Sequence, residues 1–323
     1  MPCRLTITHR STVAAAAAVC LGAALLGSAA PASAADADAP ASASAPASFV
    51  PVAAPAAPAS DEVSYWTPER RAAATEDDGP GDATAASGSE AGSEAATSDA
   101  TRTVNHAEQI APVSHIGRIY YVQEGYGHWC SANVVASANG STIATAGHCV
   151  TMDQTFSTQM VFYPAYESGG SPYGGWPVVG GNVTSGWYAG NNADQAEDSA
   201  FMAVARDGDG ATVQSVVGAS PVLFDQSATQ VFSAFGYPAV GRFDGEHLDR
   251  CTGPGTAAGS AQILIACDMT GGVSGGPILA GDGSDGAQIA NVAERDDTGT
   301  HNLGPLWQAS AHSAYDLTAA ITT

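Results

Sequence analysis

The chain has 323 residues, with 32 acidic side chains against 10 arginines and no lysine, and its formal net charge is −22. Nucleic-acid binding and docking on anionic membranes both need clustered basic side chains, so this balance excludes both classes of partner. With 37 glycines and only 13% charged residues, the chain is also not a coiled coil or an ordinary helical bundle.

Aromatic residues divide the chain into two parts. Residues 1–105 hold three of them (Phe49, Tyr65 and Trp66), whereas residues 106–323 hold the other 20 together with 31 of the 37 glycines. A segment that has little apolar bulk to bury cannot offset the entropy lost on ordering its backbone. We therefore expect the globular domain to span residues 106–323.

The first 34 residues are typical of an export signal. Arg4 and Arg10 precede an apolar run over residues 12–26, and the small residues 32–34 suit cleavage after Ala34. The alternative is a membrane anchor, but the apolar run is short and rich in alanine for a spanning helix. We predict a secreted, extracellular protein that is free of the membrane once residues 1–34 are removed.

Residues 35–105 are predicted to be a largely disordered pro-segment or linker. They are rich in Ala, Pro and Ser at first, and then in Gly, Ser and acidic residues. Residues 63–71 are an exception, because Thr67 is placed to cap a short helix that begins at Pro68. The pair Tyr65-Trp66 beside it predicts docking onto another surface; the alternative is a chance aromatic pair in a spacer.

Four cysteines remain after signal removal: Cys130, Cys149, Cys251 and Cys267. An even number in an exported chain predicts two disulfides. Sequential pairing would close loops of 18 and 15 intervening residues, and each bond would contribute about 3 kcal/mol. A zinc site is the alternative, but the chain has no Cys-x-x-Cys pair and only His148 neighbours a cysteine. No metal and no cofactor are expected.

The domain is predicted to be all-β. Many short apolar or β-branched segments lie between glycine-rich turns, which is typical of a sandwich or barrel. Asn139-Gly140 indicates a hairpin, and the one helical candidate is the C-terminal segment 306–320. The expected strands are residues 116–122, 132–136, 143–146, 160–163, 200–204, 230–235, 262–267, 277–280 and 288–293.

Three segments carry residues suited to catalysis. His148 follows a small-residue strand end and precedes a cysteine, which restricts the ring as a general base requires. Asp198 precedes an apolar strand, where its carboxylate can turn inward and orient an imidazole. Ser274 is flanked by four glycines, so the amides of Gly272 and Ser274 can converge on one point and form an oxyanion hole.

The order His148, Asp198, Ser274 resembles that of the trypsin/chymotrypsin-like serine peptidases. The resemblance implies two six-stranded antiparallel barrels with a short C-terminal helix, and a serine endopeptidase that cleaves polypeptides. Ser274 would then attack the carbonyl, His148 would relay the proton, and Asp198 would orient the ring. It covers most of residues 113–323 and is carried by Cys130-Ser131-Ala132, Thr145-Ala146-Gly147-His148-Cys149, Asp198-Ser199-Ala200 and Gly272-Val273-Ser274-Gly275-Gly276-Pro277.

The chain departs from the trypsin branch just before the serine. Trypsin-like zymogens pair a new N-terminus with an acid there, but this chain has Val273. The pro-segment must still be removed or displaced, and we place the mature start between about residues 101 and 114. The chain is more similar to the secreted bacterial branch that includes glutamyl endopeptidases, on the segments Tyr65-Trp66-Thr67-Pro68-Glu69-Arg70, Phe235-Gly236-Tyr237-Pro238 and Cys267-Asp268-Met269-Thr270-Gly271-Gly272.

The residue preference at the cleavage site remains open from the sequence. Asp268 lies six residues before the serine, where trypsin carries the acid that binds Arg or Lys, although the neighbouring cysteine is placed differently. Thr270 and His301 would suit a glutamate side chain. A small or apolar preference is the third possibility.

Two other functions must be weighed. An inactive homologue acting as a secreted binding module would typically have lost a catalytic residue, and all three are present. The run 272–276 also fits G-x-S-x-G, the elbow of α/β-hydrolase esterases. That elbow needs a helix directly after Ser274, which Gly275-Gly276-Pro277 disfavours.

We expect a monomer whose partners are polypeptide substrates and its own pro-segment.

Overall fold

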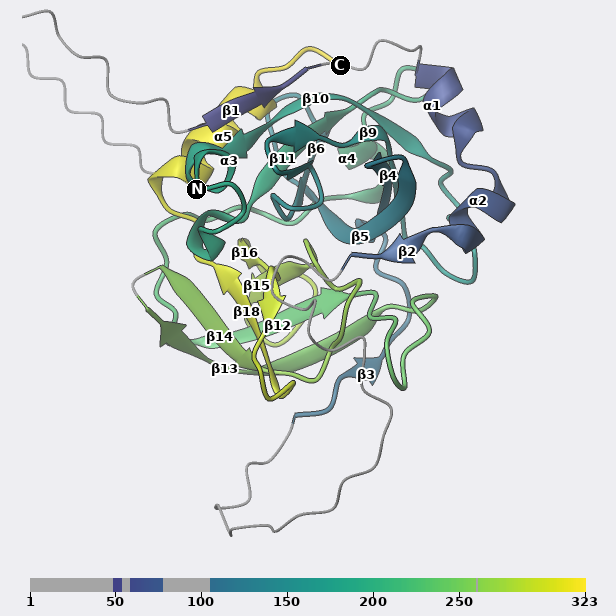
Figure 1. The fold of residues 1–323 in the computed structure, drawn as a ribbon. Coiled ribbons are helices and arrows are strands. Elements are labelled where there is room, and N and C mark those ends of the chain that lie inside the picture. The colour runs from purple at the N-terminus through teal and green to yellow at the C-terminus, as the bar shows by residue number, and fades with distance from the viewer. Residues whose placement is uncertain (1–48, 54–58, 78–104, 260) are drawn as a thin grey trace, which may run out of the picture. The chain divides into compact units, whose positions relative to one another are not determined.

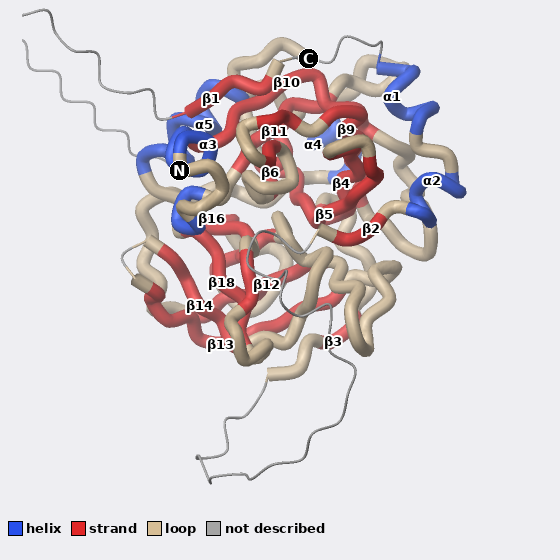
Figure 2. The backbone as a smooth tube through the Cα atoms, viewed as in Figure 1, coloured by secondary structure: helices blue, strands red, loops and turns tan. Residues whose placement is uncertain are grey.

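The computed structural model describes residues 49–53, 59–77, 105–259 and 261–323. The predicted signal peptide and much of the predicted pro-segment lie outside these ranges. Figures 1 and 2 show the strands in two groups, β4 to β11 in one and β12 to β18 in the other.

The first group is a closed six-stranded antiparallel barrel. Its strand order is β10-β11-β6-β5-β4-β9, and β9 pairs with β10 to close it. The hairpin β7–β8 and the short helices α3, η1 and α4 belong to its connections. The bounds are β4 (Ile116–Gln123), β5 (Tyr126–Val135), β6 (Thr142–Thr145), β7 (Thr151–Met152), β8 (Thr155–Phe156), β9 (Thr158–Pro164), β10 (Trp176–Thr184), α3 (Ser185–Ala189), η1 (Gln195–Glu197), β11 (Ala200–Val204) and α4 (Val213–Val217).

The second group is a half-barrel in the order β16-β15-β12-β13-β14-β18-β17, with β3 added to β13. In the described part of the chain, β16 and the residue that follows β18 are joined by one isolated bridge, Ala290–Leu306. Helix α5 (Ala309–Ala319) follows and packs back on β10 and β11. The bounds are β3 (Glu108–Gln109), β12 (Val231–Gly236), β13 (Asp249–Ala258), β14 (Gln262–Ala266), β15 (Pro277–Ala280), β16 (Gln288–Asn291), β17 (Glu294–Arg295) and β18 (His301–Pro305).

The predicted fold class is confirmed, with its short C-terminal helix. Each of the nine expected strands overlaps an observed one, and the Asn139-Gly140 turn joins β5 to β6 with Gly140 at φ 65°. Both disulfides follow the sequential pairing, Cys130–Cys149 and Cys251–Cys267. Strands β10 and β13 were not predicted, because glycines interrupt their apolar pattern.

Part of the predicted pro-segment packs on the first barrel. It comprises β1 (Phe49–Val52), α1 (Ala59–Tyr65), α2 (Pro68–Ala73) and β2 (Thr75–Glu76). As expected, Thr67 caps α2 and accepts a hydrogen bond from the Arg70 amide at 3.3 Å. Strand β1 extends the sheet by pairing with β10 and was not predicted, because the alanines and prolines around it are typical of a linker. Val52 is its buried residue, and Val50 packs beside it against the barrel core.

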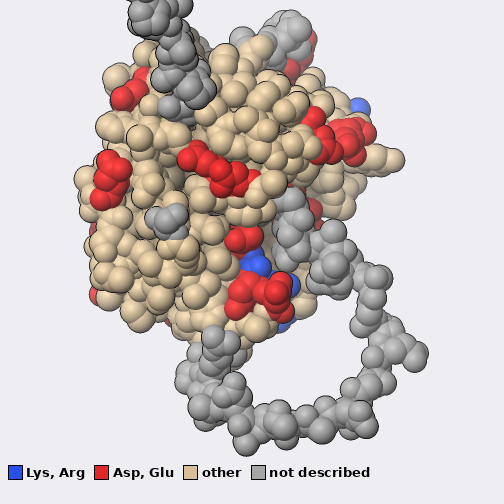
Figure 3. Space-filling model, turned by 60° about the vertical axis from the view of Figure 1, so that its left-hand side comes forward, with Lys and Arg blue, Asp and Glu red and all other residues tan. Residues whose placement is uncertain are grey.

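Acidic side chains lie in several separate groups over the face drawn in Figure 3, where few basic ones are visible. This agrees with the strong negative charge of the chain. Within the described ranges, no helix is long and apolar enough to cross a membrane.

Candidate active site

Ser274 lies in a tight loop before β15, and two glycines allow the loop to adopt its path. Gly272 has φ 94° and Gly275 has φ 79°, values that side chains rarely allow. A Cβ atom on Gly272 would lie 2.3 Å from the Trp129 ring, and one on Gly275 would lie 2.1 Å from Thr145 Oγ1. The bare backbone therefore brings Ser274 close to strands β5 and β6 of the first barrel.

The segment after Ser274 is a strand. Residues 277–280 form β15, which pairs with β12 and β16. An α/β-hydrolase elbow requires a helix at this place. The structure therefore contradicts the esterase alternative.

His148 and Asp198 are held together in the first barrel. His148 follows β6 and precedes Cys149, which the disulfide ties to Cys130 of β5. Its Nδ1 lies 2.6 Å from Asp198 Oδ2, and its amide donates to Asp198 Oδ1 at 2.8 Å. Both side chains are fully buried. One carboxylate thus fixes both the ring and the backbone of His148, so that Nδ1 faces Asp198 and Nε2 is on the other side of the ring.

A residue of the second strand group holds Asp198 and its neighbour Ser199 by hydrogen bonds. Asn291 of β16 donates through Nδ2 to the Asp198 carbonyl at 3.0 Å, and its Oδ1 accepts from Ser199 Oγ at 2.7 Å. Trp307 Nε1 also donates to Asn291 Oδ1, at 3.1 Å. All four side chains are buried. The backbone position of Asp198 therefore depends on contacts between the two strand groups.

Ser131 of β5, in the first barrel, holds the Ser274 loop by hydrogen bonds. Its amide donates to the Ser274 carbonyl at 2.8 Å. Its hydroxyl donates to the Gly272 carbonyl at 2.8 Å and accepts from the Tyr237 amide at 2.9 Å. We assigned Ser131 no role from the sequence; its place directly after Cys130, on the strand that faces the loop, was the available signal.

One carbonyl oxygen is bound in the Ser274 loop, and it belongs to the predicted pro-segment. The amide of Gly272 and the hydroxyl of Ser274 both donate to Asp77 O, each at 3.3 Å. Gly272 is one of the two residues predicted to supply an oxyanion hole. No motif in the sequence indicates that residue 77 reaches this point.

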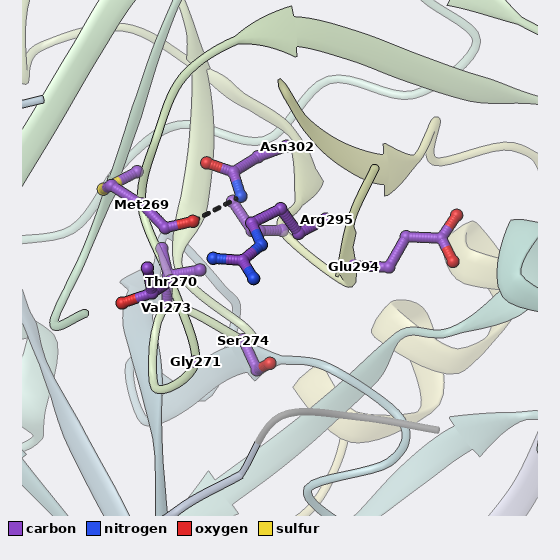
Figure 4. A pocket seen from close by; sticks show the side chains of 9 residues that line it. Met269, Thr270, Gly271, Val273, Ser274, Glu294, Arg295 and Asn302 are labelled. Carbon is purple, nitrogen blue, oxygen red and sulfur yellow. Dashed lines mark hydrogen bonds between the residues drawn. The ribbon is translucent and has the colours of Figure 1, made fainter. Parts of the chain in front are cut away.

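A small pocket opens beside Ser274 (Figure 4). The guanidinium of Arg295 lies inside it near Asn302, whereas the side chain of Glu294 points away. Arg295 Nε and Asn302 Oδ1 are buried and, among the described residues, have no hydrogen-bond partner. The space left is about 10 Å³, enough for one water-sized molecule. The lining residues are Met269, Thr270, Gly271, Val273, Ser274, Val292, Glu294, Arg295 and Asn302.

Of the three residues predicted for specificity, only Thr270 lines this pocket. Asp268 is bound by Arg242 Nη2 at 3.0 Å, by His106 at 2.8 Å and by the Ala107 amide at 2.7 Å. Burial raises the pKa of the Asp268 carboxyl, but the hydrogen bonds from Arg242 and the Ala107 amide outweigh this and lower it.

His301 is likewise engaged elsewhere, with Nδ1 3.0 Å from Asp296 Oδ2. The pocket residue that the sequence did not indicate is Arg295. Its position two residues after the buried pair Val292-Ala293 gives no sign that the side chain turns into the pocket.

A zinc ion would find no free thiolate at the cluster of Cys130, His148 and Cys149. Cys130, His148 and Cys149 bring their ligand atoms within 4.8 Å of one another. The two sulfurs, however, are joined in a disulfide. This cluster therefore positions His148 by a covalent link.

Solved structures that are similar to this chain include bacterial serine proteases. Protease Anisep from Arthrobacter nicotinovorans aligns with 34% identity and a TM-score of 0.63, over 67% of this chain and 100% of that one. The thermostable serine protease AL20, from an extremophilic microorganism, aligns with 38% identity and a TM-score of 0.61, over 64% and 97%. A Glu endopeptidase aligns with 20% identity and a TM-score of 0.54, over 67% and 97%, and so shares the fold.

Searches with protein-family models and among curated proteins found no match. On the structural matches, the chain belongs to the chymotrypsin-like serine peptidases and resembles the glutamyl endopeptidases. The predicted family is confirmed.

Proposed function

We propose that the protein is a secreted serine endopeptidase with Ser274 as its nucleophile, His148 as its general base and Asp198 as the group that orients the ring. The observation that carries the proposal is the convergence of the Gly272 amide and the Ser274 hydroxyl on one carbonyl oxygen. The tight His148–Asp198 pair supports it. One predicted oxyanion donor, the Gly272 amide, thus binds a carbonyl oxygen next to the proposed nucleophile, as acyl transfer requires.

The reaction follows from these positions. His148 Nε2 takes the proton of Ser274 Oγ as the oxygen attacks the carbonyl carbon, and the amides of Gly272 and Ser274 stabilise the oxyanion. The imidazolium, stabilised by Asp198, then gives its proton to the leaving amine as the C–N bond breaks. Water, deprotonated by His148, attacks the acyl-enzyme and releases the acid and the free Ser274 hydroxyl. The protein needs no cofactor for these steps.

Secretion and processing are supported by two observations. Two disulfides suit an oxidising compartment outside the cell. Residues 75–77 lie against the catalytic groups, so the pro-segment must leave before a substrate can bind. We place the signal at residues 1–34, the pro-segment at 35–105 and the peptidase domain, acting as a monomer, at 106–323.

We further propose that the pocket beside Ser274 selects a carboxylate side chain on the residue whose carbonyl is attacked. The Arg295 guanidinium now occupies the pocket and leaves about 10 Å³, so it must shift within the pocket to admit that carboxylate. Arg295 supplies a half-buried cation whose buried Nε–H has no hydrogen-bond partner among the described residues. Thr270 also lines the pocket, with its hydroxyl bonded to the amide and carbonyl of Val240. A lysine or arginine would meet a like charge there, and Asp268, the acid that would suit them, is held elsewhere.

A fluorophosphonate probe on the processed protein tests the reaction. We expect an adduct on Ser274 that disappears in Ser274→Ala and falls at least 1,000-fold in rate in His148→Ala. His312→Ala is the matched control, since His312 is half-exposed on α5 and should leave the rate unchanged. An unlabelled Ser274, or unaltered labelling of His148→Ala, would instead favour a secreted binding module.

Peptides that differ only at the attacked residue test the pocket. We expect glutamate to exceed glutamine at least tenfold in kcat/KM, and Arg295→Leu to remove this preference while labelling of Ser274 persists. A higher kcat/KM for lysine than for glutamate would refute the assignment of Arg295.

A further inference from the structure

The pro-segment contacts the enzyme at two separate places. Between residues 66 and 71 it lies on the outside of the first barrel, and at residues 75–77 it enters the catalytic site. Helix α2 joins the two places. We call residues 66–71 the anchor and residues 75–77 the blocking strand.

The anchor is built on Trp66, whose side chain is 2% exposed. Its Nε1 donates to the Gln159 carbonyl at 2.5 Å, and its ring packs 5.2 Å from that of Tyr120. The approach depends on Gly127, where a Cβ atom would lie 3.1 Å from the indole. A buried aromatic residue with its N–H satisfied is typical of an energetically dominant contact.

Arg71 completes the anchor. One end of its guanidinium donates to the Trp66 carbonyl at 2.5 Å and the other to the Gly169 carbonyl at 3.0 Å. It also lies 4.9 Å over the ring of Tyr163. The anchor thus engages β9 and its neighbouring loop, away from the catalytic residues.

The blocking strand runs parallel to β5. Thr75 pairs with His128 and Glu76 with Trp129, and the Asp77 amide donates to the Trp129 carbonyl at 3.1 Å. The Asp77 carbonyl then receives the hydrogen bonds from Gly272 and Ser274. A substrate carbonyl could not reach these donors at the same time.

Asp77 does not sit as a substrate would. Its side chain does not turn to the pocket beside Ser274; it accepts a hydrogen bond from the hydroxyl of Tyr121, which lies 3.2 Å from Cys130 Sγ. Residues 75 and 76 lie beside Trp129, next to the Cys130–Cys149 disulfide that adjoins His148. In the proposed mechanism His148 gives its proton to the leaving amine, so the residues that follow the scissile bond of a substrate would lie on this side. The blocking strand therefore approaches Ser274 with its chain direction reversed.

We propose that residues 59–77 form an inhibitor that binds the peptidase domain through the Trp66 anchor, occupies the oxyanion site with the Asp77 carbonyl, and resists cleavage because its chain runs opposite to a substrate. It binds whether or not it is joined to the domain, so it also inhibits after the chain is cut. This inference rests on the proposed function for its inhibitory effect, whereas the binding itself does not.

The first experiment uses the full chain carrying Trp66→Ala. We expect its Ser274 to react with the fluorophosphonate at least tenfold faster than that of the wild-type full chain, because the blocking strand loses its anchor. Ala73→Ser, an exposed change at the end of helix α2, should react at the wild-type rate. Equal rates in the Trp66→Ala and wild-type chains would overturn the proposal.

The second experiment adds a fluorescent peptide of residues 59–82 to the Trp66→Ala full chain. We expect saturable binding by anisotropy and a return to slow labelling, with affinity at least tenfold lower for the same peptide carrying Trp66→Ala. Mass spectrometry should find the bond after Asp77 intact after prolonged incubation. Cleavage at that bond would refute the reversed direction, and absence of binding would refute the anchor.

The two proposals can fail separately. Binding is also measured in a chain that carries both Trp66→Ala and Ser274→Ala, in which no reaction occurs. If the peptide binds there but Ser274 is never labelled in any variant, the anchor stands and the peptidase function falls. If Ser274 is labelled but the peptide does not bind, the reverse holds.

Discussion

Replacing Ser131 with alanine tests whether one buried hydroxyl holds the Ser274 loop. The side chain has no exposed surface, donates to the Gly272 carbonyl at 2.8 Å and accepts from the Tyr237 amide at 2.9 Å. Alanine keeps the Cβ atom and removes both bonds. The Tyr237 N–H and the Gly272 carbonyl then lose this partner where little water can replace it.

The magnitude follows from those two bonds. A buried donor left unsatisfied costs about 1–3 kcal/mol. We therefore expect the free energy of unfolding of Ser131→Ala to be about 2–3 kcal/mol lower than that of the wild type. The change also loosens Gly272, whose amide is one oxyanion donor. Losing such a donor outright costs about 100- to 1,000-fold in rate, and a donor that is merely loosened should cost about tenfold in kcat/KM.

Urea unfolding of the full chain, with an unchanged dependence on denaturant, measures the first effect. Peptide hydrolysis by the processed protein measures the second. Ser233→Ala is the matched control, because Ser233 is equally buried but bonds to the Thr252 hydroxyl and the Gly281 carbonyl, away from the site. A stability loss below about 0.5 kcal/mol in Ser131→Ala, or equal loss of activity in both variants, would refute the reasoning.

Three further predictions concern other parts of the molecule. Replacing Cys130 and Cys149 together with alanine should lower the free energy of unfolding by about 3 kcal/mol, because the bond closes a loop with a sequence separation of 19; an unshifted urea midpoint would contradict this. Gly275→Ala should abolish labelling of Ser274, because its Cβ atom would lie 2.1 Å from Thr145 Oγ1, and a wild-type labelling rate would show that the loop can relax. Burial raises the pKa of Asp249 to about 6, so its ionisation destabilises the fold as the pH rises from about 4 through 6. The Asn variant at this position should therefore gain about 1–2 kcal/mol at pH 8 after allowance for solvent screening, and nothing below pH 4; urea unfolding that gives a pH-independent difference would contradict the assignment.

The two longest strands that the sequence did not reveal, β10 and β13, contain glycines that allow close backbone approach. Strand β10 contains Gly180 at a register shift and Gly181, whose Cβ atom would lie 2.4 Å from the Phe201 carbonyl oxygen of β11. In β13, a Cβ atom on Gly255 would lie 2.6 Å from the Ala228 carbonyl oxygen. Read along the sequence, such glycines are typical of turns. Their role depends on which strand lies opposite, and that is a property of the folded chain.

The direction of the side chains around the pocket could not be predicted from the sequence either. Asp268 has the offset from the serine that suits a specificity acid, yet Arg242 and His106 bind it. Arg295 has no motif around it, yet its guanidinium lies in the pocket (Figure 4). An offset along the chain fixes where a backbone atom lies relative to Ser274, whereas the direction of a side chain depends on partners that are distant in sequence.

The candidate catalytic residues could be identified from the sequence because each one stands in a recognisable local frame, but the contacts that fix them cross between the two strand groups. Asp198 of the first barrel is held by Asn291 of the second, and the Ser274 loop of the second is held by Ser131 of the first. In both hydrogen-bonded pairs the partners are more than 90 positions apart in the sequence. Both bonds form only when the two strand groups are in contact. The blocking strand follows the same rule, since its Asp77 amide bonds to β5 and its carbonyl to Gly272. The catalytic geometry is therefore a product of the interface between the barrels, and a segment that spans this interface can compete with a substrate without resembling one in chain direction.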